Sequence, residues 1–137
     1  MIDDEKRKVA LITGSAGFIG FHISKKLLDE GWKVVGLDSL SDYYDVNLKN
    51  EREKILLKNE NYLSIHEKIE KKGLLIDLME KENPKIIIHL AAQAGVRYSI
   101  ERPRSYLDSN IIGTFELLEA ARVCKPQHML LASTSSI

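Results

Sequence analysis

Residues 8–20 read KVALITGSAGFIG, and this stretch decides the fold that we expect. The apolar run at 8–13 predicts a buried strand, and three glycines follow it at a spacing of three, Gly14, Gly17 and Gly20. So tight a turn needs a residue that tolerates positive φ, and a phosphate group needs bare backbone to approach. The amphipathic stretch 17–31 then predicts a helix, whose free N–H groups and positive dipole end would face that phosphate. Because the glycine turn lies between a strand and a helix, the motif predicts dinucleotide binding rather than a merely structural turn.

The alternation of strand and helix continues outward from this motif. Further strands are expected at 33–38, 61–69, 85–92 and 127–133, and further helices at 46–59, 73–83 and 104–124. Five strands alternating with helices indicate an α/β fold with a parallel sheet. We expect a Rossmann-type, doubly wound sheet in the order 3-2-1-4-5, whose ligands lie beyond the carboxyl ends of the strands.

Composition excludes several other classes of function. Hydrophobic residues make up 44% of the 137, and 20 basic residues balance 20 acidic ones, so no general attraction to nucleic acid or to anionic membrane is expected. No apolar run approaches the ~18 residues of a membrane span, and the charged start lacks the apolar core of a signal peptide. Cys124 is the only cysteine, which excludes an intrachain disulfide and suits the reducing cytoplasm.

Asp38 stands at the predicted end of the second strand, 18 residues after Gly20. A carboxylate there can accept hydrogen bonds from both hydroxyls of an adenosine ribose, and it would repel a 2′-phosphate. The following DSLSDYYD (38–45) holds no Arg or Lys to offset that repulsion, so we expect NAD rather than NADP. The alternative is a strand-end Asp that caps a turn.

The ends of the fourth and fifth strands carry small and hydroxyl side chains. Ala91, Ala92 and Ala94 would let a flat ligand lie against the backbone. His89 is interpreted as a core histidine, and the scatter of the other histidines predicts no metal site. The fifth strand ends in four consecutive hydroxyls, 133–136, which suit hydrogen bonding to a polyol or simply lead into a loop.

TGSAGFIG (13–20), GLDSLSDYYD (36–45), HLAAQAGVRYSIERPRSYLDSN (89–110) and LLASTSSI (130–137) together resemble the extended short-chain dehydrogenase/reductases. Within these they resemble nucleotide-sugar epimerases, and most closely the UDP-glucuronate 4-epimerases. The resemblance implies that tightly bound NAD oxidises C4 of UDP-glucuronate. Reduction of the 4-keto intermediate on its other face then gives UDP-galacturonate, for a surface polysaccharide. Thr134 matches the family residue that hydrogen-bonds the sugar 4-hydroxyl.

The resemblance also assigns binding residues. The positions carried over as cofactor-binding are Gly14, Gly17, Phe18, Ile19, Gly20, Asp38, Ser39, Ile69, Leu90, Ala91, Ala92, Ala94 and Ser109. Lys68 replaces the family's adenine-binding Asp, and Lys offers no acceptor, so adenine would be held through the backbone at Ile69 or bound more weakly. Ser135 and Ser136 stand where related dehydratases carry acid–base carboxylates, which favours epimerisation. With Arg97 they are candidates for the sugar carboxylate, although Arg97 paired with Glu101 is an equal alternative.

The family's catalytic Tyr belongs to a YxxxK pair, and no Tyr of this chain has Lys four residues later. Relatives place that pair after the hydroxyl strand. We therefore expect residues 1–137 to be the N-terminal NAD-binding domain of a longer chain, ending before the last strands and the substrate domain and inactive alone.

Three alternatives stay open at this point. The apolar residues of the 104–124 helix predict a homodimer, or else burial under a further domain. The substrate could instead be a neutral or N-acetylated UDP-hexose. The chain could also be a non-catalytic NAD-sensing module.

Overall fold

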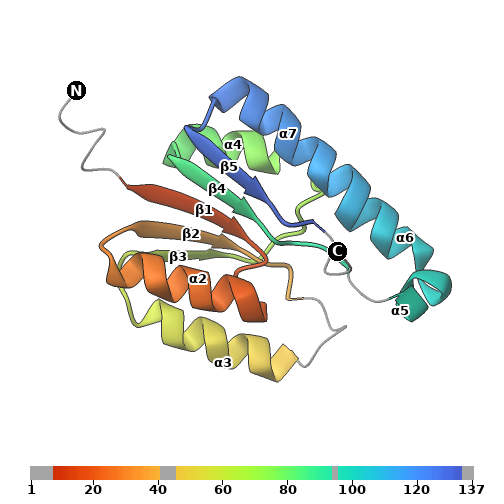
Figure 1. The fold of residues 1–137 in the computed structure, drawn as a ribbon, viewed down its shortest axis with the longest axis horizontal. Coiled ribbons are helices and arrows are strands. Elements are labelled where there is room, and N and C mark those ends of the chain that lie inside the picture. Colours follow the sequence, from red (N-terminus) through yellow and green to blue (C-terminus); the bar gives the residue numbers. More distant parts are fainter. Residues whose placement is uncertain (1–7, 41–45, 94–95, 134–137) are drawn as a thin grey trace.

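All five predicted strands form one parallel sheet in the computed structural model, which describes residues 8–40, 46–93 and 96–133 (Figure 1). The strands are β1 (Val9–Thr13), β2 (Lys33–Leu37), β3 (Tyr62–Ile65), β4 (Ile86–His89) and β5 (His128–Leu131). Their order is β3-β2-β1-β4-β5, which confirms the predicted topology. Since β1 pairs with both β2 and β4, the ends of these three strands meet at the middle of one sheet edge.

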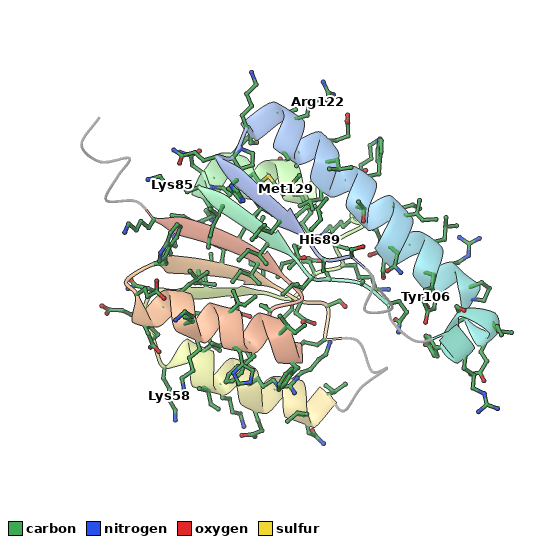
Figure 2. The ribbon with its side chains drawn as sticks, in the orientation of Figure 1. Lys58, Lys85, His89, Tyr106, Arg122 and Met129 are labelled. Carbon is green, nitrogen blue, oxygen red and sulfur yellow. The ribbon has the colours of Figure 1, made fainter. Side chains whose placement is uncertain are left out.

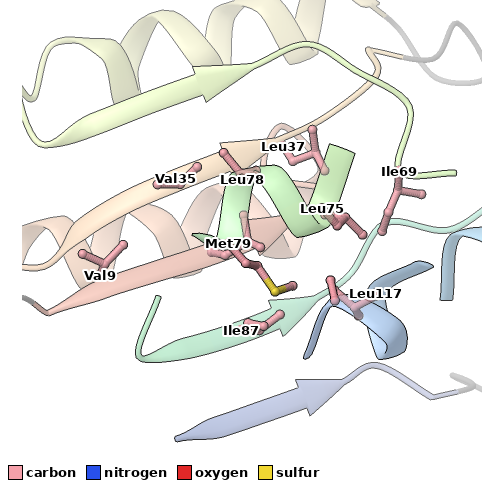
Figure 3. Close-up of a cluster of buried hydrophobic side chains, with 11 residues drawn as sticks. Val9, Val35, Leu37, Ile69, Leu75, Leu78, Met79, Ile87 and Leu117 are labelled. Carbon is pink, nitrogen blue, oxygen red and sulfur yellow. The ribbon is translucent and has the colours of Figure 1, made fainter. Parts of the chain in front are cut away.

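The sheet is buried on both faces, which explains the continuous apolar runs of its strands. Successive side chains point to opposite faces, so neighbours in sequence belong to different cores. Leu11 and Ile87 pack with helices α4 (Leu74–Glu82) and α7 (Gly113–Cys124), where Met79 and Leu117 face them (Figure 3). The next residues in sequence, Ile12 and Ile88, pack on the other face with helices α2 (Phe18–Asp29) and α3 (Val46–Leu57).

The helical region after β4 differs from the prediction. A short helix, α5 (Val96–Glu101), occupies a stretch for which no helix was expected. The predicted long helix is present, but it comprises α6 (Pro103–Tyr106), a π-helical segment η1 (Leu107–Ile112) and α7. Gly113, the first residue of α7, lies against Ile69, where a Cβ would stand 2.6 Å from the Ile69 Cγ2. Figure 1 shows α5 and α6 beyond the ends to which the strands point.

All five strands are shorter than predicted, and β3 and β4 differ most from the prediction. The strand expected at 61–69 ends at Ile65, and the strand expected at 85–92 ends at His89. In both cases the backbone runs on beyond the end of the strand, and after β4 the Leu90 amide still donates to the Thr13 carbonyl at 3.1 Å. The residues released in this way, 66–70 and 90–93, lie at the carboxyl edge of the sheet.

Candidate functional site

A cleft of about 1670 Å³ opens at the carboxyl ends of the strands. It exceeds the ~300–1,000 Å³ of most small-molecule pockets, so it has room for an extended ligand of two parts. The predicted binding residues that line it are Gly14, Gly17, Phe18, Ile19, Gly20, Asp38, Ser39, Ile69, Leu90, Ala91, Ala92 and Ser109. The tertiary structure therefore brings together residues from five separate parts of the sequence.

The glycine turn fits a closely approaching anion. Gly14 has φ +74°, and a Cβ there would lie 2.9 Å from the amide nitrogen of Ala91. A Cβ on Gly20 would lie 2.1 Å from the carbonyl oxygen of Gly14, so the helix can pack on the turn only without a side chain. Gly17 is the N-cap of α2 and provides no capping side chain. The first amides of α2 therefore have no acceptor from a cap, and they line the cleft with the positive end of the helix dipole.

Side chains from neighbouring elements hold this turn in place through hydrogen bonds. The Asp38 Oδ2 accepts a hydrogen bond from the Ala16 amide at 3.0 Å. Tyr62, from β3, hydrogen-bonds Ser15, and burial raises the pKa of the Tyr62 phenol to about 12. Arg52, from α3, donates through Nη1 to the Ala16 carbonyl at 3.1 Å. The turn is thus held by β2, β3 and α3 as well as by its own glycines.

Asp38 caps a turn, as one of the two sequence-based alternatives predicted, and it also lies in the cleft. Its Oδ1 accepts from the Leu40 amide at 2.8 Å, which makes it a turn-capping residue. It also lines the cleft with a buried carboxylate. A carboxylate has about four acceptor positions, and the amides of Ala16 and Leu40 occupy two of them.

The expectation that no cation offsets Asp38 is wrong. Lys49, on α3, places its Nζ 3.3 Å from the Asp38 Oδ1, and its side chain is only 12% exposed. The guanidinium of Arg52 lies 5.9 Å from the centre of the Phe18 ring, above the first turn of α2. The prediction from sequence considered only the residues directly after β2. It missed the cations of α3, which lie close to Asp38 in the folded chain. Their spacing of three residues on one helix was the available signal.

Thr13 and His89 organise the loop after β4. The Thr13 Oγ1 accepts from the amides of Leu90 and Ala91, each at 3.0 Å, and lies 2.7 Å from the His89 Nδ1. The hydroxyl proton of Thr13 is therefore directed to Nδ1, and the neutral imidazole carries its proton on Nε2. Burial lowers the pKa of His89 to about 4, consistent with this neutral form. Figure 2 shows His89 at the end of β4, on the side of the sheet edge where Tyr106 lies on α6. The interpretation of His89 as a core histidine is confirmed.

Asn110 joins the π-helical segment to the same loop. Its Oδ1 accepts from the Gln93 amide at 2.8 Å, and its Nδ2 donates to the Gln93 carbonyl at 3.1 Å. Thr114 donates to the Asn110 carbonyl at 2.7 Å and lies 3.5 Å from the His89 Nε2. These residues line the cleft but were not predicted to do so. A hydrogen-bonded pair 17 residues apart leaves no periodic pattern in the sequence.

The end of the cleft near β3 contains the residues expected to face adenine. Lys68 is exposed and Ile69 is buried, and both line the cleft. Glu67 and Glu70 line it as well, so carboxylates flank Lys68, which stands where the family resemblance predicts an Asp. Glu67 accepts a hydrogen bond from Lys71 at 3.1 Å.

Several predicted residues are not placed in the cleft. Ala94 and Thr134, Ser135 and Ser136 lie outside the described residues, while Ser133, the first of the hydroxyl row, lines the cleft. Arg97 is exposed on α5 and does not line the cleft. It also forms no ion pair with Glu101 in the part of the chain that the structure describes.

Residues 8–40, 46–93 and 96–133 contain neither a candidate metal site nor a candidate membrane span. No group of three or more His, Cys, Asp or Glu side chains there could hold a metal ion. None of the helices in these ranges has the length and apolar character needed to cross a membrane.

Comparison with known proteins gives consistent matches across most of the chain. The family model described as GDP-mannose 4,6 dehydratase matches residues 11–137. A probable UDP-glucuronate 4-epimerase of Rhizobium meliloti is 50% identical over 127 residues, which cover 93% of this chain and 37% of that protein. The chain therefore spans about two fifths of the length of such relatives.

Solved structures match in the same way. The crystal structure of UDP-glucuronic acid 4-epimerase from Bacillus cereus, in complex with UDP-glucuronic acid and NAD, superposes with a TM-score of 0.86 at 34% identity. It covers 94% of this chain and 41% of its own. The UDP-glucose 4-epimerase of Thermotoga maritima, solved with UDP-glucose, gives a TM-score of 0.77 at 33% identity, over 92% of this chain and 38% of its own.

Proposed function

Because the chain belongs to the nucleotide-sugar epimerases of the extended short-chain dehydrogenase/reductase family, we propose that residues 1–137 form the NAD-binding domain of a UDP-glucuronate 4-epimerase. The whole protein then interconverts UDP-glucuronate and UDP-galacturonate. The observation that carries this proposal is the single cleft in which the glycine turn, Asp38 and the Leu90–Ala92 backbone come together. Similarity to an epimerase solved with UDP-glucuronic acid and NAD supports the choice of sugar and cofactor.

The residues of the cleft fit NAD in a defined order. The amides at the start of α2 would hold the pyrophosphate, because they have no side-chain cap and lie at the positive end of the helix dipole. Asp38 would accept from the ribose of the adenosine. Ala91 and Ala92, whose small side chains leave the backbone accessible, would lie against the nicotinamide end, with Ser109 nearby on η1. When bound, NAD supplies a hydride acceptor and donor for C4 of the sugar.

The chain's own contribution near the sugar is the hydroxyl row. Thr134 would hydrogen-bond the 4-hydroxyl, and Ser135 and Ser136 would donate to the C5 carboxylate. Neither serine ionises near neutral pH, so this row would hold the carboxylate without acid–base chemistry at C5 or C6. That arrangement favours inversion at C4 over loss of water or of CO₂.

A test of this function uses the protein expressed from its complete reading frame. We expect the purified protein to release NAD on denaturation and to convert UDP-glucuronate to UDP-galacturonate, both detected by chromatography. Rates on UDP-glucose and UDP-N-acetylglucosamine, measured beside it, should be at least about tenfold lower. Bound NAD with faster turnover of UDP-glucose would instead support the second candidate, a UDP-glucose 4-epimerase, which the match to the Thermotoga maritima structure favours. Bound NAD without turnover of any of the three sugars would favour a sensing module.

We also propose that the whole protein is a homodimer through the long helix. A stripe of exposed apolar side chains runs along η1 and α7 at spacings of four and three residues, Leu107, Ile111, Phe115 and Leu118. Apolar residues at these spacings lie on one side of a helix, so they form a continuous surface for another helix. A second copy of the same helix would bury this stripe.

A further inference from the structure

We propose that Lys49 and Arg52 form a binding site for the 2′-phosphate of NADP, which the Asp38 carboxylate masks in the natural protein. This inference rests on the proposed binding of a dinucleotide in the cleft. It concerns whether the site accepts NAD or NADP, and which residues determine that selectivity.

The first step is the charge at the ribose end of the cleft. From the residues that follow β2 we expected one carboxylate and no cation. The structure instead places Lys49 within 3.3 Å of the Asp38 Oδ1, and Arg52 donates to the neighbouring Ala16 carbonyl at 3.1 Å. All three side chains line the cleft. Within the described residues, the Asp38 carboxylate therefore contacts one cation and has a second close by, and its removal would take a negative charge away from this end of the cleft.

The second step is the burial of these groups. Asp38 is 6% exposed and the Lys49 side chain 12%, so water screens their interaction weakly. Within the described residues, Asp38 is the acceptor recorded for the Lys49 Nζ. Neutralising Asp38 would remove that counter-charge from a largely buried ammonium, which favours an incoming anion.

The third step is the geometry of recognition. A residue in the position of Asp38 accepts from the ribose hydroxyls, so a phosphate on the 2′-hydroxyl would lie beside that carboxylate. The same place is within reach of the Lys49 ammonium, because the ammonium already contacts the Asp38 Oδ1. Arg52 has five N–H donors, of which one is used at Ala16 in the described residues, and a guanidinium pairs well with phosphate.

These points explain how a cationic site can coexist with selection for NAD. A 2′-phosphate with about two negative charges would be repelled by Asp38 and would compete with it for Lys49. Asp38 thus disfavours NADP in two ways. It repels the 2′-phosphate directly, and it pairs with Lys49, the cation nearest to that phosphate. Lys49 and Arg52 are consequently specificity-determining residues that the sequence next to β2 does not reveal.

The test measures the affinities for NAD and NADP by calorimetry, on the protein from its complete reading frame after retained dinucleotide has been stripped. The natural protein should bind NAD. Asp38→Asn keeps an oxygen for the Ala16 amide and removes the charge, and it should raise the affinity for NADP by about tenfold or more. In the Asp38→Asn variant, a second substitution, either Lys49→Met or Arg52→Met, should lower the affinity for NADP by about tenfold. Lys54→Met is the matched control, because Lys54 lies on the same helix, is 70% exposed and pairs with Glu51 away from the cleft.

The outcomes separate this inference from the proposed function. If the natural protein binds neither dinucleotide, the proposed function fails. If it binds NAD but Asp38→Asn gains no affinity for NADP, or gains it regardless of Lys49 and Arg52, the masked site is disproved. If circular dichroism shows that Asp38→Asn folds poorly, the single variant Lys49→Met tests the inference instead. Its ratio of NADP affinity to NAD affinity should be about tenfold lower than that of the natural protein. An unchanged ratio contradicts the inference.

Discussion

The hydroxyl of Thr13 has three hydrogen-bond neighbours but only one proton, and this determines the protonation state of His89. Two of the neighbours are backbone amides, which can only donate. The Thr13 proton must then go to the His89 Nδ1, which has to be an unprotonated acceptor. Protonation of His89 would place a donor against a donor at this contact. The loop at 90–93 therefore depends on a neutral histidine.

This dependence predicts how stability changes with pH. The pKa of His89 is lowered from 6.5 to about 4 by burial, so between these values the unfolded state binds more protons. The free energy of unfolding should therefore fall as the pH falls from about 6.5 to about 4, and His89 should account for roughly 3 kcal/mol of that loss. Chemical denaturation of the whole protein across this range measures it.

A pair of histidine variants isolates the contribution. His89→Asn should be less stable than the natural protein at pH 7, and the difference should shrink toward pH 4. His128→Asn, at an exposed position at the start of β5, should leave the pH dependence unchanged. A His89→Asn difference that stays constant across the range would show that the histidine does not titrate with folding.

At the scale of elements, the π-helical segment η1 lies where the long helix lines the cleft. A π-helical segment widens the helix and changes the direction of its side chains, and such segments are frequent at functional sites. Here it accompanies the double hydrogen bond between Asn110 and the Gln93 backbone. The loop after β4 is thus held by a helix that lies far from it in the sequence.

Removing the Asn110 amide should therefore affect both stability and binding. We expect Asn110→Ala to lower the free energy of unfolding by about 1–3 kcal/mol, because the Gln93 amide and carbonyl lose their partners. Affinity for the dinucleotide should also fall, since the same loop lines the cleft. Denaturant titration and calorimetry measure the two effects.

Asn59 provides the comparison. Its Oδ1 accepts from the Asn61 amide at 2.9 Å in the turn before β3, away from the cleft. Asn59→Ala should lower stability modestly and leave binding unchanged. Equal losses of binding in both variants would mean that Asn110 acts only through general stability.

At the scale of the whole molecule, η1 and α7 carry a stripe of exposed apolar side chains. Phe115, at 58% exposure, lies near its middle. Leu117 and Ala120, on the opposite side of α7, are buried against the sheet and α4. One helix thus has an apolar side toward the core and a second apolar side toward solvent.

The proposed dimer predicts the effect of a charge in this stripe. Phe115→Asp should convert the whole protein from dimer to monomer, because an unpaired charge cannot be buried between two helices. Light scattering after size exclusion should show the molar mass halved. Ile100→Asp, at an exposed apolar position on α5 outside the stripe, should stay dimeric. A dimeric Phe115→Asp variant would place the subunit contact elsewhere.

The sequence alone determined the order of the sheet and the sheet edge at which the cleft lies. This was possible because the signals are local: alternating apolar runs give the strands, and Gly14, Gly17 and Gly20 identify the turn through backbone sterics that depend on few neighbours. Twelve predicted residues consequently line one cleft.

Only the tertiary structure decided which side chains surround those residues. Lys49 and Arg52 belong to a helix without a clear apolar face, so its periodicity could not show which side turns inward. The pairing of Asn110 with Gln93 and of Thr13 with His89 likewise joins residues 17 and 76 positions apart. The physical reason is that hydrogen bonds and charges act over a few ångströms in space, whatever the distance along the chain.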